Sequence, residues 1–593
     1  MLSRKNKNIK KNILIVSQLR DNNSVSDNHI FFLNEGCKLY KTQKYYKYEK
    51  LKNTSIVDYK ISSKNLDKDF NYLLKVYELL LNELTIKLNK IHKLNYKKTY
   101  WRIVIGSWLF EFISILFDNW SKIKHINKKY SIKYVKIARN NGKDLIFKNH
   151  NDFSFCSLTD EFNNQIYFDL IKYSKKLEPI FFKPFNKKEK LVINKKNLFK
   201  EFIYIFYSKI LILWNFFYNS NSKIIVFHDS YFSKIINFTL QIRLRQFPLF
   251  YRFSIEENNE LNKNIRLEKF KYTNDNFVKI VKDLIFKYMP LSYLENFKSI
   301  CERANNNDYI KEPRIIFTSS SFINDDYFSI FLAEKKKKLK IKFISGQHGG
   351  NFYIDKLMFN EIHQKKISDK IITWGYKKEK IYQPLFNYKT VNIKLKHDQN
   401  GSLLVVNYEI SRFSGIHPGF RNFSYLRYLN DQFNFLKKLE LQVSEKCIVR
   451  LYPYSYGWNT KDRFKEFNSN IIFDNNRSIE NSLKKSRICY VNFNSTVFLE
   501  TLNYNFPTVI FFNLKQDPIR KDSIPYFKVL KKAQIFFDNE ELAAAHINNV
   551  WNKVDQWWYS RLVQDSVNVF CKRYSRRCSK PISSLYNFFS SLK

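Results

Sequence analysis

The sequence predicts an α/β fold made of two Rossmann-like domains that face a cleft. Short apolar segments alternate with helical patterns along most of the chain, as in βαβ units with parallel strands. Several of these segments end in small or polar residues, as parallel strands do where they run into a loop. A polar stretch rich in Lys and Asn, between Tyr376 and Gly401, separates two such series and is the predicted linker.

The first series combines a buried helix with candidate strands. Residues 100–120 are apolar on nearly every side, which predicts a helix that is buried all round. The candidate strands, with the residues that follow them, are 12–19 (NILIVSQL), 223–230 (KIIVFHDS), 313–322 (PRIIFTSSSF), 342–350 (KFISGQHGG) and 369–376 (DKIITWGY).

The second series has the same alternation. An amphipathic helix is predicted over 422–441, with a helical turn at Ile479 and Leu483, a helix over 495–502 and a helical tail from Glu540. The candidate strands are 402–410, 447–453, 470–474, 487–493 and 507–513. We therefore expect an N-terminal domain with helical insertions over 1–390, a C-terminal domain over 391–540 and a tail over 541–593.

The composition is that of a folded protein with several domains. The chain has 593 residues, more than the about 250–300 residues that one hydrophobic core sustains. Hydrophobic residues make up 44% and include 56 Phe and 39 Tyr, which argues against global disorder.

The formal net charge is +48, from 102 Lys and Arg against 54 Asp and Glu. Such an excess of positive charge is typical of proteins that bind nucleic acid, an acidic membrane face or anionic substrates. The basic residues are mostly Lys, however, and they are spread through the chain beside abundant Asn, Ile, Phe and Tyr. This spread indicates a compositional bias more than a binding surface, so no nucleic-acid partner is expected.

A cytoplasmic location is expected. The seven cysteines are scattered and form no disulfide framework, and the apolar run after MLSRKNKNIKKN is too short for a signal peptide. The most apolar long window, residues 202–218, is interrupted by Ser208 and Lys209 and is shorter than the about 20 residues of a spanning helix. We expect a buried helix there; peripheral docking at the inner face of an anionic membrane is the alternative.

The first group of candidate site residues is Gly346, Gln347, His348, Gly349 and Gly350. Three of the chain's 11 glycines surround one histidine at the end of a predicted strand. Glycine allows close approach to the backbone, and histidine can act as a general base or donate a hydrogen bond to a phosphate. The alternative is a loop histidine bound by the neighbouring domain, with glycines that serve only the turn.

Two arginines of the second series are candidate phosphate ligands. Arg450 lies inside an apolar strand that Tyr452 ends, and a guanidinium there needs an anion. An ion pair with a carboxylate such as Asp474 explains Arg450 equally well. Arg412 follows another strand, where it is placed to meet a phosphate or carboxylate, or to pair with Glu409.

The third group is Asn494, Ser495, Thr496 and Glu500. A predicted strand ends before Asn494, and a helix starts after it. Ser and Thr are good N-caps, and a helix N-terminus favours an anion, so the two hydroxyls serve either the cap or a phosphate, or both. Glu500, one turn into the helix, either reaches a sugar hydroxyl or lies in solvent.

Other chemistry has little support in the sequence. It contains no GxxxxGK[ST], GxGxxG, GxSxG or HExxH motif, and no DxD motif that argues for a divalent cation on a diphosphate. The pair His228-Asp229 alone is a weak signal for a metal. We therefore expect no metal and no cofactor.

Five segments in this order resemble a family of transferases found in O-antigen and other surface-polysaccharide loci: 100–109, 345–353, 368–376, 450–458 and 494–512. The resemblance runs from Asn12 to about Phe512. This family often carries a Gly-Glu-Trp-Cys-like stretch, which here reads FLNEGCKLY, so no role is assigned to Glu35.

The second half is more distantly similar to capsule-type 3-deoxy-octulosonate transferases and bacterial sialyltransferases, which are two-domain glycosyltransferases of the B type. In those enzymes a His-Pro pair and a Ser-Ser/Thr pair bind the nucleotide monophosphate of a CMP-activated sugar. This chain has Tyr452-Pro453 and Ser495-Thr496 at these places. Because Tyr452 replaces the histidine, a CMP-linked donor is only one of the donors that the resemblance allows. The architecture usually works without metal.

The resemblance implies a metal-independent glycosyltransferase that moves a sugar from a nucleotide-activated donor to a surface-polysaccharide or lipid-linked glycan acceptor. The donor phosphate is expected at the Ser495-Thr496 helix end, aided by Arg412 or Arg450. His348 is expected to reach across from the acceptor side, as a base or as a phosphate ligand. A CDP-alditol phosphotransferase is the nearest alternative, and a non-catalytic polyanion-binding protein is another.

Overall fold

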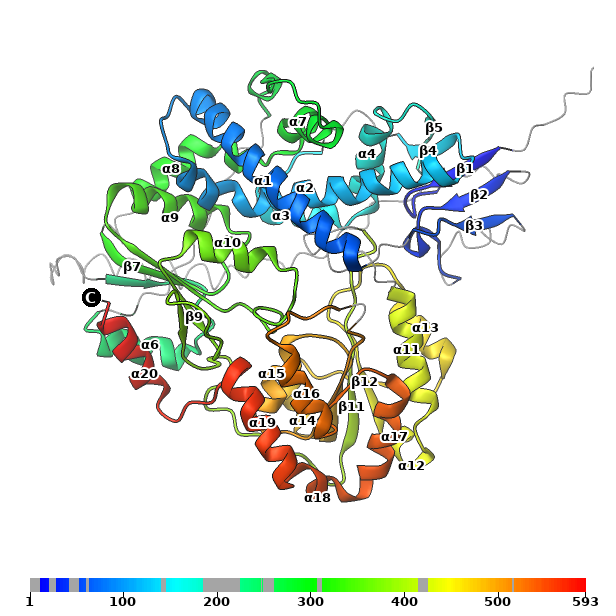
Figure 1. Ribbon diagram of the computed structural model, residues 1–593, viewed down its shortest axis with the longest axis vertical. Coiled ribbons are helices and arrows are strands. Elements are labelled where there is room, and N and C mark those ends of the chain that lie inside the picture. The colour runs from blue at the N-terminus through cyan, green and yellow to red at the C-terminus, as the bar shows by residue number, and fades with distance from the viewer. Residues whose placement is uncertain are drawn as a thin grey trace, which may run out of the picture.

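The computed structural model describes residues 11–20, 28–41, 53–59, 63–139, 145–184, 224–246, 248, 261–306, 312–413, 425–514 and 517–592. Three sheets, each with only parallel pairings between the strands described, organise the molecule (Figure 1). The predicted α/β fold class with Rossmann-like parallel sheets is confirmed. The range 1–390, predicted as one domain, contains two of these sheets, and the predicted domain limits stay predictions.

The first sheet has the strand order β3-β2-β1-β4-β5. Its strands are β1 (Asn12–Ile15), β2 (His29–Phe32), β3 (Thr54–Ile56), β4 (Tyr134–Ala138) and β5 (Glu178–Phe182). The helices of this part of the chain are α1 (Ser63–His92), α2 (Lys98–Lys129), α3 (His150–Ser157) and α4 (Asp160–Ile171).

Helix α2 is the central helix of the N-terminal half. It packs against α1, α9 and α10, and its residues from Tyr100 to Trp120 are buried without interruption, which confirms the predicted buried helix. The helix is long and apolar enough to cross a membrane, with a mean hydropathy of 1.4 over its most apolar 18 residues. That whole window is buried inside the protein, as in the core helix of a globular domain.

The second sheet follows the simple order β10-β9-β8-β7-β6. Its strands are β6 (Ile224–Phe227), β7 (Pro313–Thr318), β8 (Lys342–Gly346), β9 (Lys370–Thr373) and β10 (Tyr382–Pro384). The helices in this range are α6 (Lys234–Arg243), α7 (Asn276–Tyr288), α8 (Phe297–Asn305), α9 (Asp326–Lys338) and α10 (Phe359–Ile367). The predicted helix at residues 202–218 lies outside the described residues.

The third sheet has the order β13-β12-β11-β14-β15-β16, the strand order of a doubly wound dinucleotide-binding fold. Its strands are β11 (Ser402–Val406), β12 (Cys447–Arg450), β13 (Ile472–Phe473), β14 (Ser486–Val491), β15 (Thr508–Phe511) and β16 (Phe536–Phe537). The helices between them are α11 (Tyr425–Lys437), α12 (Leu441–Ser444), α13 (Thr460–Phe467), α14 (Ile479–Leu483), α15 (Thr496–Asn503) and α16 (Ile524–Lys532). The order reverses between β11 and β14, where such folds bind ligands.

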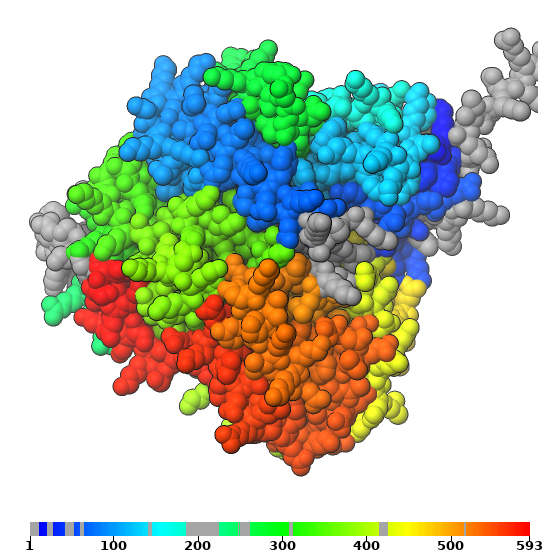
Figure 2. Space-filling view, viewed as in Figure 1, coloured from blue at the N-terminus to red at the C-terminus, as the bar shows by residue number. Residues whose placement is uncertain are grey.

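The C-terminal helices connect the third sheet back to the second. They are α17 (Glu540–Val550), α18 (Val554–Trp558), α19 (Arg561–Tyr574) and α20 (Pro581–Ser590). Helix α19 packs on α15 and α16, whereas α20 packs on α6 of the second sheet. Between them, Arg576 N donates to Trp374 O at 2.7 Å. Figure 2 shows the red C-terminal segment lying against green segments of the second sheet's region.

Candidate active site

The structure brings the glycine-rich loop after β8 onto the N-terminus of α15. Gly350 N donates a hydrogen bond to Thr496 Oγ1 at 3.0 Å. A Cβ on Gly350 would lie 2.3 Å from Ser495 O, so only glycine fits against that backbone. Gly349 has more room, since its nearest neighbour would be Thr496 Oγ1 at 3.3 Å. Two groups of predicted site residues, from different sheets, therefore meet.

Gly346 and Gln347 form the scaffold of this loop. A Cβ on Gly346 would lie 2.4 Å from Ser319 Oγ, so the position has no room for a side chain. The buried Gln347 amide donates from Nε2 to Gly349 O at 3.0 Å and accepts from Trp374 N at 2.9 Å. Both residues hold the loop in shape. Their predicted role in donor binding stays a prediction.

His348 lies half-buried in the loop and contacts a tyrosine that follows β6. Its Nδ1 is 2.9 Å from Tyr231 Oη, and Tyr231 adopts a left-handed φ of 64°, which is costly for a residue other than glycine. The ammonium of Lys389 lies over the Tyr231 ring, 4.4 Å from its centroid. The His348–Tyr231–Lys389 cluster thus assembles from three segments of the second-sheet region.

Glu500 of α15 interacts with the same cluster from the third sheet. Burial raises the pKa of the Glu500 carboxyl to about 7, with a partly opposing effect from the nearby Lys389 charge. Burial also lowers the pKa of Lys389, against the influence of Glu500. Burial thus disfavours the charged forms of both side chains, and an anionic ligand that approaches Lys389 would favour its protonated form.

Ser495 and Asn494 have identifiable structural roles. Ser495 is the N-cap of α15, with its hydroxyl accepting from Val497 N at 3.2 Å, so the capping interpretation is confirmed. Asn494 Nδ2 donates to the carboxylate of Asp355, in the segment that follows the glycine-rich loop. Burial raises the pKa of Asp355 to about 7, although Asn494 and other partners lower it in part.

Two buried side-chain amides near the reversal of strand order each have one atom without a hydrogen-bond partner within the described part of the chain. The atoms are Asn407 Nδ2, directly after β11, and Asn494 Oδ1, three residues after β14. Unsatisfied polar atoms cost free energy when they are buried, so such groups point to a ligand or to ordered water. Their place is the one at which doubly wound folds bind nucleotides.

Arg412 joins the third sheet to the first. Its Nη2 donates to Asp160 Oδ2 at 2.6 Å, at the start of α4. Its Nη1 donates to Gly36 O at 3.1 Å and its Nε to Tyr456 O at 2.6 Å. The guanidinium is paired with a carboxylate of the protein. A phosphate role for Arg412 stays a prediction.

Arg450 is paired inside the third-sheet domain. It forms the ion pair with Asp474 that the sequence offered as an explanation, and its Nη1 also donates to Asn476 O at 2.9 Å. Tyr452 is 39% exposed and packs against Tyr454 and Tyr456. The ion pair supplies the anion that Arg450 needs, and the donor-binding role of both residues stays a prediction.

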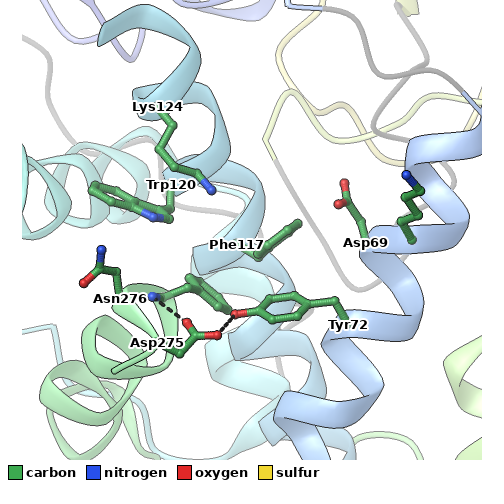
Figure 3. Close-up of a pocket in the computed structure, with 9 residues that line it drawn as sticks. Asp69, Tyr72, Phe117, Trp120, Lys124, Asp275 and Asn276 are labelled. Carbon is green, nitrogen blue, oxygen red and sulfur yellow. Dashed lines mark hydrogen bonds between the residues drawn. The ribbon is translucent and has the colours of Figure 1, made fainter. Parts of the chain in front are cut away.

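A separate pocket of about 380 Å³ lies among helices α1, α2 and α7. Figure 3 shows Tyr72 and Asp275 joined by a hydrogen bond at its centre, with Phe117 and Trp120 of α2 beside them. None of its lining residues belongs to the Gly350–Thr496 contact or to the His348–Tyr231–Lys389 cluster. Residues 67–69 read Asp-Lys-Asp and so have the spacing of a DxD motif. They lie within helix α1 and not in a loop that follows a strand.

Sequence reasoning missed Tyr231, Lys389 and Asp355 as members of this region. Tyr231 follows a predicted strand end, so its position was a usable signal. Lys389 is one of many lysines in a polar stretch, and nothing in the sequence distinguishes it. Asp355 acquires its place only through the contact between two sheets.

Residues 13–589 match the family model described as LIC12162 family transferase. The predicted class of enzyme, a transferase, is thereby confirmed. No curated protein is significantly similar to the chain.

Several solved structures align with part of the chain. The spinosyn rhamnosyltransferase SpnG complexed with spinosyn aglycone is 7% identical and covers 50% of this chain and 80% of its own, with a TM-score of 0.27. The wall teichoic acid polymerase TagF is 10% identical, with coverages of 50% and 84% and a TM-score of 0.27. WaaG, a glycosyltransferase involved in lipopolysaccharide biosynthesis, is 9% identical, with coverages of 62% and 100% and a TM-score of 0.26. The fold class of the chain rests on the sheet orders described above.

Proposed function

Because this chain belongs to the LIC12162 family of transferases, we propose that it transfers a sugar from a nucleotide-activated donor to a surface-polysaccharide or lipid-linked glycan acceptor. The observation that carries the proposal is the contact between the His348 loop and the α15 N-terminus. It places a histidine, a lysine and a helix N-terminus in one region, beside the reversal of strand order in a doubly wound sheet.

The donor nucleotide is proposed to bind the third sheet at that reversal. Asn407 Nδ2 and Asn494 Oδ1, which have no partner among the described residues, supply hydrogen bonds to it. The donor phosphate lies toward Thr496, where the helix dipole and the Lys389 ammonium both favour negative charge. Arg412 and Arg450 are not needed in this arrangement, since each pairs with a carboxylate of the protein.

His348 is proposed to act as the general base. If its Nδ1–H donates to Tyr231 Oη, then Nε2 carries the lone pair that accepts the acceptor's proton. The acceptor oxygen then bonds to the anomeric carbon, the bond from that carbon to the phosphate oxygen breaks, and its electron pair leaves with the nucleotide. Because Lys389 supplies positive charge for the leaving phosphate, His348 need not be a cation.

Glu500 is proposed to bind a hydroxyl of the donor sugar. With a pKa of about 7, its carboxyl is present in protonated and ionised forms near neutral pH, and so can donate or accept a hydrogen bond.

The enzyme is proposed to work in the cytoplasm, peripherally at the inner face of the membrane. Helix α6 begins three residues after Tyr231 and carries an exposed apolar stripe of Ile235, Phe238 and Ile242, with exposed fractions of 74%, 48% and 52%. The cations Lys234 and Arg243 lie on the same helix, which suits an anionic lipid surface.

A panel of CMP, CDP, UDP, GDP and their sugar conjugates tests the proposal, first by thermal shift and then by mass analysis of the product. A ligand that binds only the native state raises the melting temperature. We expect one nucleotide to do so, and its sugar conjugate to add one glycosyl mass to the acceptor. A product that gains an alditol phosphate would establish the phosphotransferase instead. Failure of every nucleotide to bind would contradict the proposal.

His348→Ala tests the base. We expect nucleotide binding to persist while turnover falls by about 10²–10⁴-fold. His125→Ala, in α2 at the first sheet, is the control and should keep turnover. Full turnover in His348→Ala would remove the base role.

A further inference from the structure

We propose that His228, Asp229 and Asp325 bind a divalent transition-metal cation beside the candidate active site. One ligand atom from each residue lies within 4.8 Å of the other two. His228 Nε2 is 3.3 Å from Asp325 Oδ2 and 3.9 Å from Asp229 Oδ2. The first two residues follow β6, and Asp325 precedes α9, so the set is built from the carboxyl-end loops of two neighbouring strands.

Each ligand is held by a contact outside the set. The imidazole of His228 is buried and stacks on Phe328, with ring centroids 5.3 Å apart and planes inclined by 11°. Asp325 uses Oδ1 to accept from Phe328 N at 3.0 Å, which leaves Oδ2 facing His228. Asp229 Oδ2 accepts from Ser321 Oγ at 2.9 Å. Such second contacts orient the ligands of metal sites.

The charge around the set also favours a cation. The chain has almost twice as many Lys and Arg as Asp and Glu. Within the described ranges, nevertheless, the ion pairs of Asp229 and Asp325 involve only His228, and none involves Lys or Arg. The two carboxylates carry two negative charges when ionised, which a divalent cation neutralises.

The ligand types indicate which cation. One imidazole nitrogen with two carboxylate oxygens suits Mn²⁺ or Zn²⁺ better than a cation that prefers oxygen alone. The Asp229 side chain is 61% exposed and that of Asp325 is 31% exposed, so the site opens to solvent and leaves coordination positions for water or for a ligand group.

The cation would stabilise the loop that presents Tyr231 to His348. Asp229 and Tyr231 both have left-handed φ values, 41° and 64°, which are unfavourable without a stabilising contact. This inference goes beyond the proposed function and departs from the expectation of no metal. Sequence spacing shows the His228-Asp229 pair but not the third ligand, which lies 97 residues after His228.

The test measures metal binding by the full chain after treatment with EDTA. Mn²⁺ is titrated in, and the signal of free Mn²⁺ is followed by electron paramagnetic resonance, with Zn²⁺ as a second probe. We expect one ion per chain, and a Kd at least about tenfold weaker in Asp229→Asn and in Asp325→Asn. Asparagine keeps the α9 cap, so Asp325→Asn should fold normally.

Asp565→Asn is the matched control, because Asp565 is an exposed carboxylate of α19 that pairs only with Arg561 among the ion pairs described. It should bind metal like the wild type, and all three variants should unfold at the wild-type temperature without metal. Absence of Mn²⁺ and Zn²⁺ binding at millimolar concentration would overturn the inference, as would unchanged binding in both Asp229→Asn and Asp325→Asn. Because the readout is binding rather than transfer, it does not depend on the proposed reaction.

Discussion

Gly350 and Thr496 join two sheets through a hydrogen bond between the Gly350 amide and Thr496 Oγ1, with donor and acceptor 3.0 Å apart. The two residues are separated by 146 positions in the sequence. The α-carbon of Gly350 faces the backbone of Ser495 so closely that no side chain fits there. This contact fixes the His348 loop relative to the third sheet.

Gly350→Ala should therefore destabilise the protein by about 1–3 kcal/mol, because the added methyl meets backbone that cannot move aside. Turnover should fall with it. Gly349→Ala is the matched control, since its methyl would meet only the Thr496 hydroxyl at 3.3 Å. Denaturant unfolding of both variants checks the difference, and equal stability of the two would contradict it.

Tyr231→Phe should lower kcat by about tenfold and shift its pH profile, while KM for the donor stays near the wild-type value. The variant keeps the ring and loses only the hydroxyl that bonds His348 Nδ1. General-base catalysis depends on the orientation and proton affinity of the imidazole. A pH–rate profile measures the effect; an unchanged profile would show that Tyr231 only packs against the loop.

Lys389→Met should weaken nucleotide binding by about tenfold, the effect of losing one charge-assisted hydrogen bond to a phosphate. The change also removes the charge that opposes the rise in the pKa of Glu500, so the pKa of that carboxyl should rise further. Titration calorimetry gives the Kd. The exposed Lys378→Met serves as control, and equal affinity of both variants would exclude Lys389 from the phosphate site.

Asp517→Asn should stabilise the protein more at pH 8 than at pH 5. Burial, and then the charge of Asp355, raise the pKa of Asp517 to about 7. The native state therefore binds more protons than the unfolded state between about pH 4 and 7, and stability falls as pH rises through that window. Asparagine does not ionise, so we expect a gain of a few kcal/mol at pH 8. Denaturant unfolding at both pH values measures it; a larger gain at pH 5 would give the opposite sign and contradict the prediction.

Replacement of Ile235, Phe238 and Ile242 by serine should reduce binding to vesicles that contain anionic lipid, because all three side chains are exposed on α6. Flotation with phosphatidylglycerol vesicles measures this binding. Leu441→Ser, which changes one side chain that is 73% exposed on α12, is a control for general surface effects. If the triple variant floats like the wild type, α6 is not the lipid-binding surface.

The strongest sequence signals lay in strands that are buried on both faces. β8 and β14 each contain adjacent apolar residues that small or polar residues follow, so His348 and Ser495, just beyond these strands, could be located from the sequence. The strands β2 and β3 of the first sheet are only four and three residues long and partly exposed, which left these two strands without a comparable signal.

Partners of charged groups could be foreseen only in part. Asp474 lies close enough in the sequence to be suggested as the partner of Arg450, and the structure contains this ion pair. Asp160, the partner of Arg412, lies 252 residues away and becomes its neighbour only when two sheets meet. The same applies to Lys389 and Glu500, whose mutual influence arises from packing between sheets.

The return of the C-terminal helices to the second sheet sets an order of events during synthesis. Trp374 O, directly after β9, accepts from Arg576 N, and Asn387 N, after β10, donates to Arg576 O. Lys342 Nζ at the start of β8 donates to Leu592 O at 3.0 Å. Domains usually fold as they leave the ribosome, N-terminal first. Here the C-terminal partners of the second sheet are synthesised about 200 residues after β10, so this sheet completes its packing only when the last helices have been made.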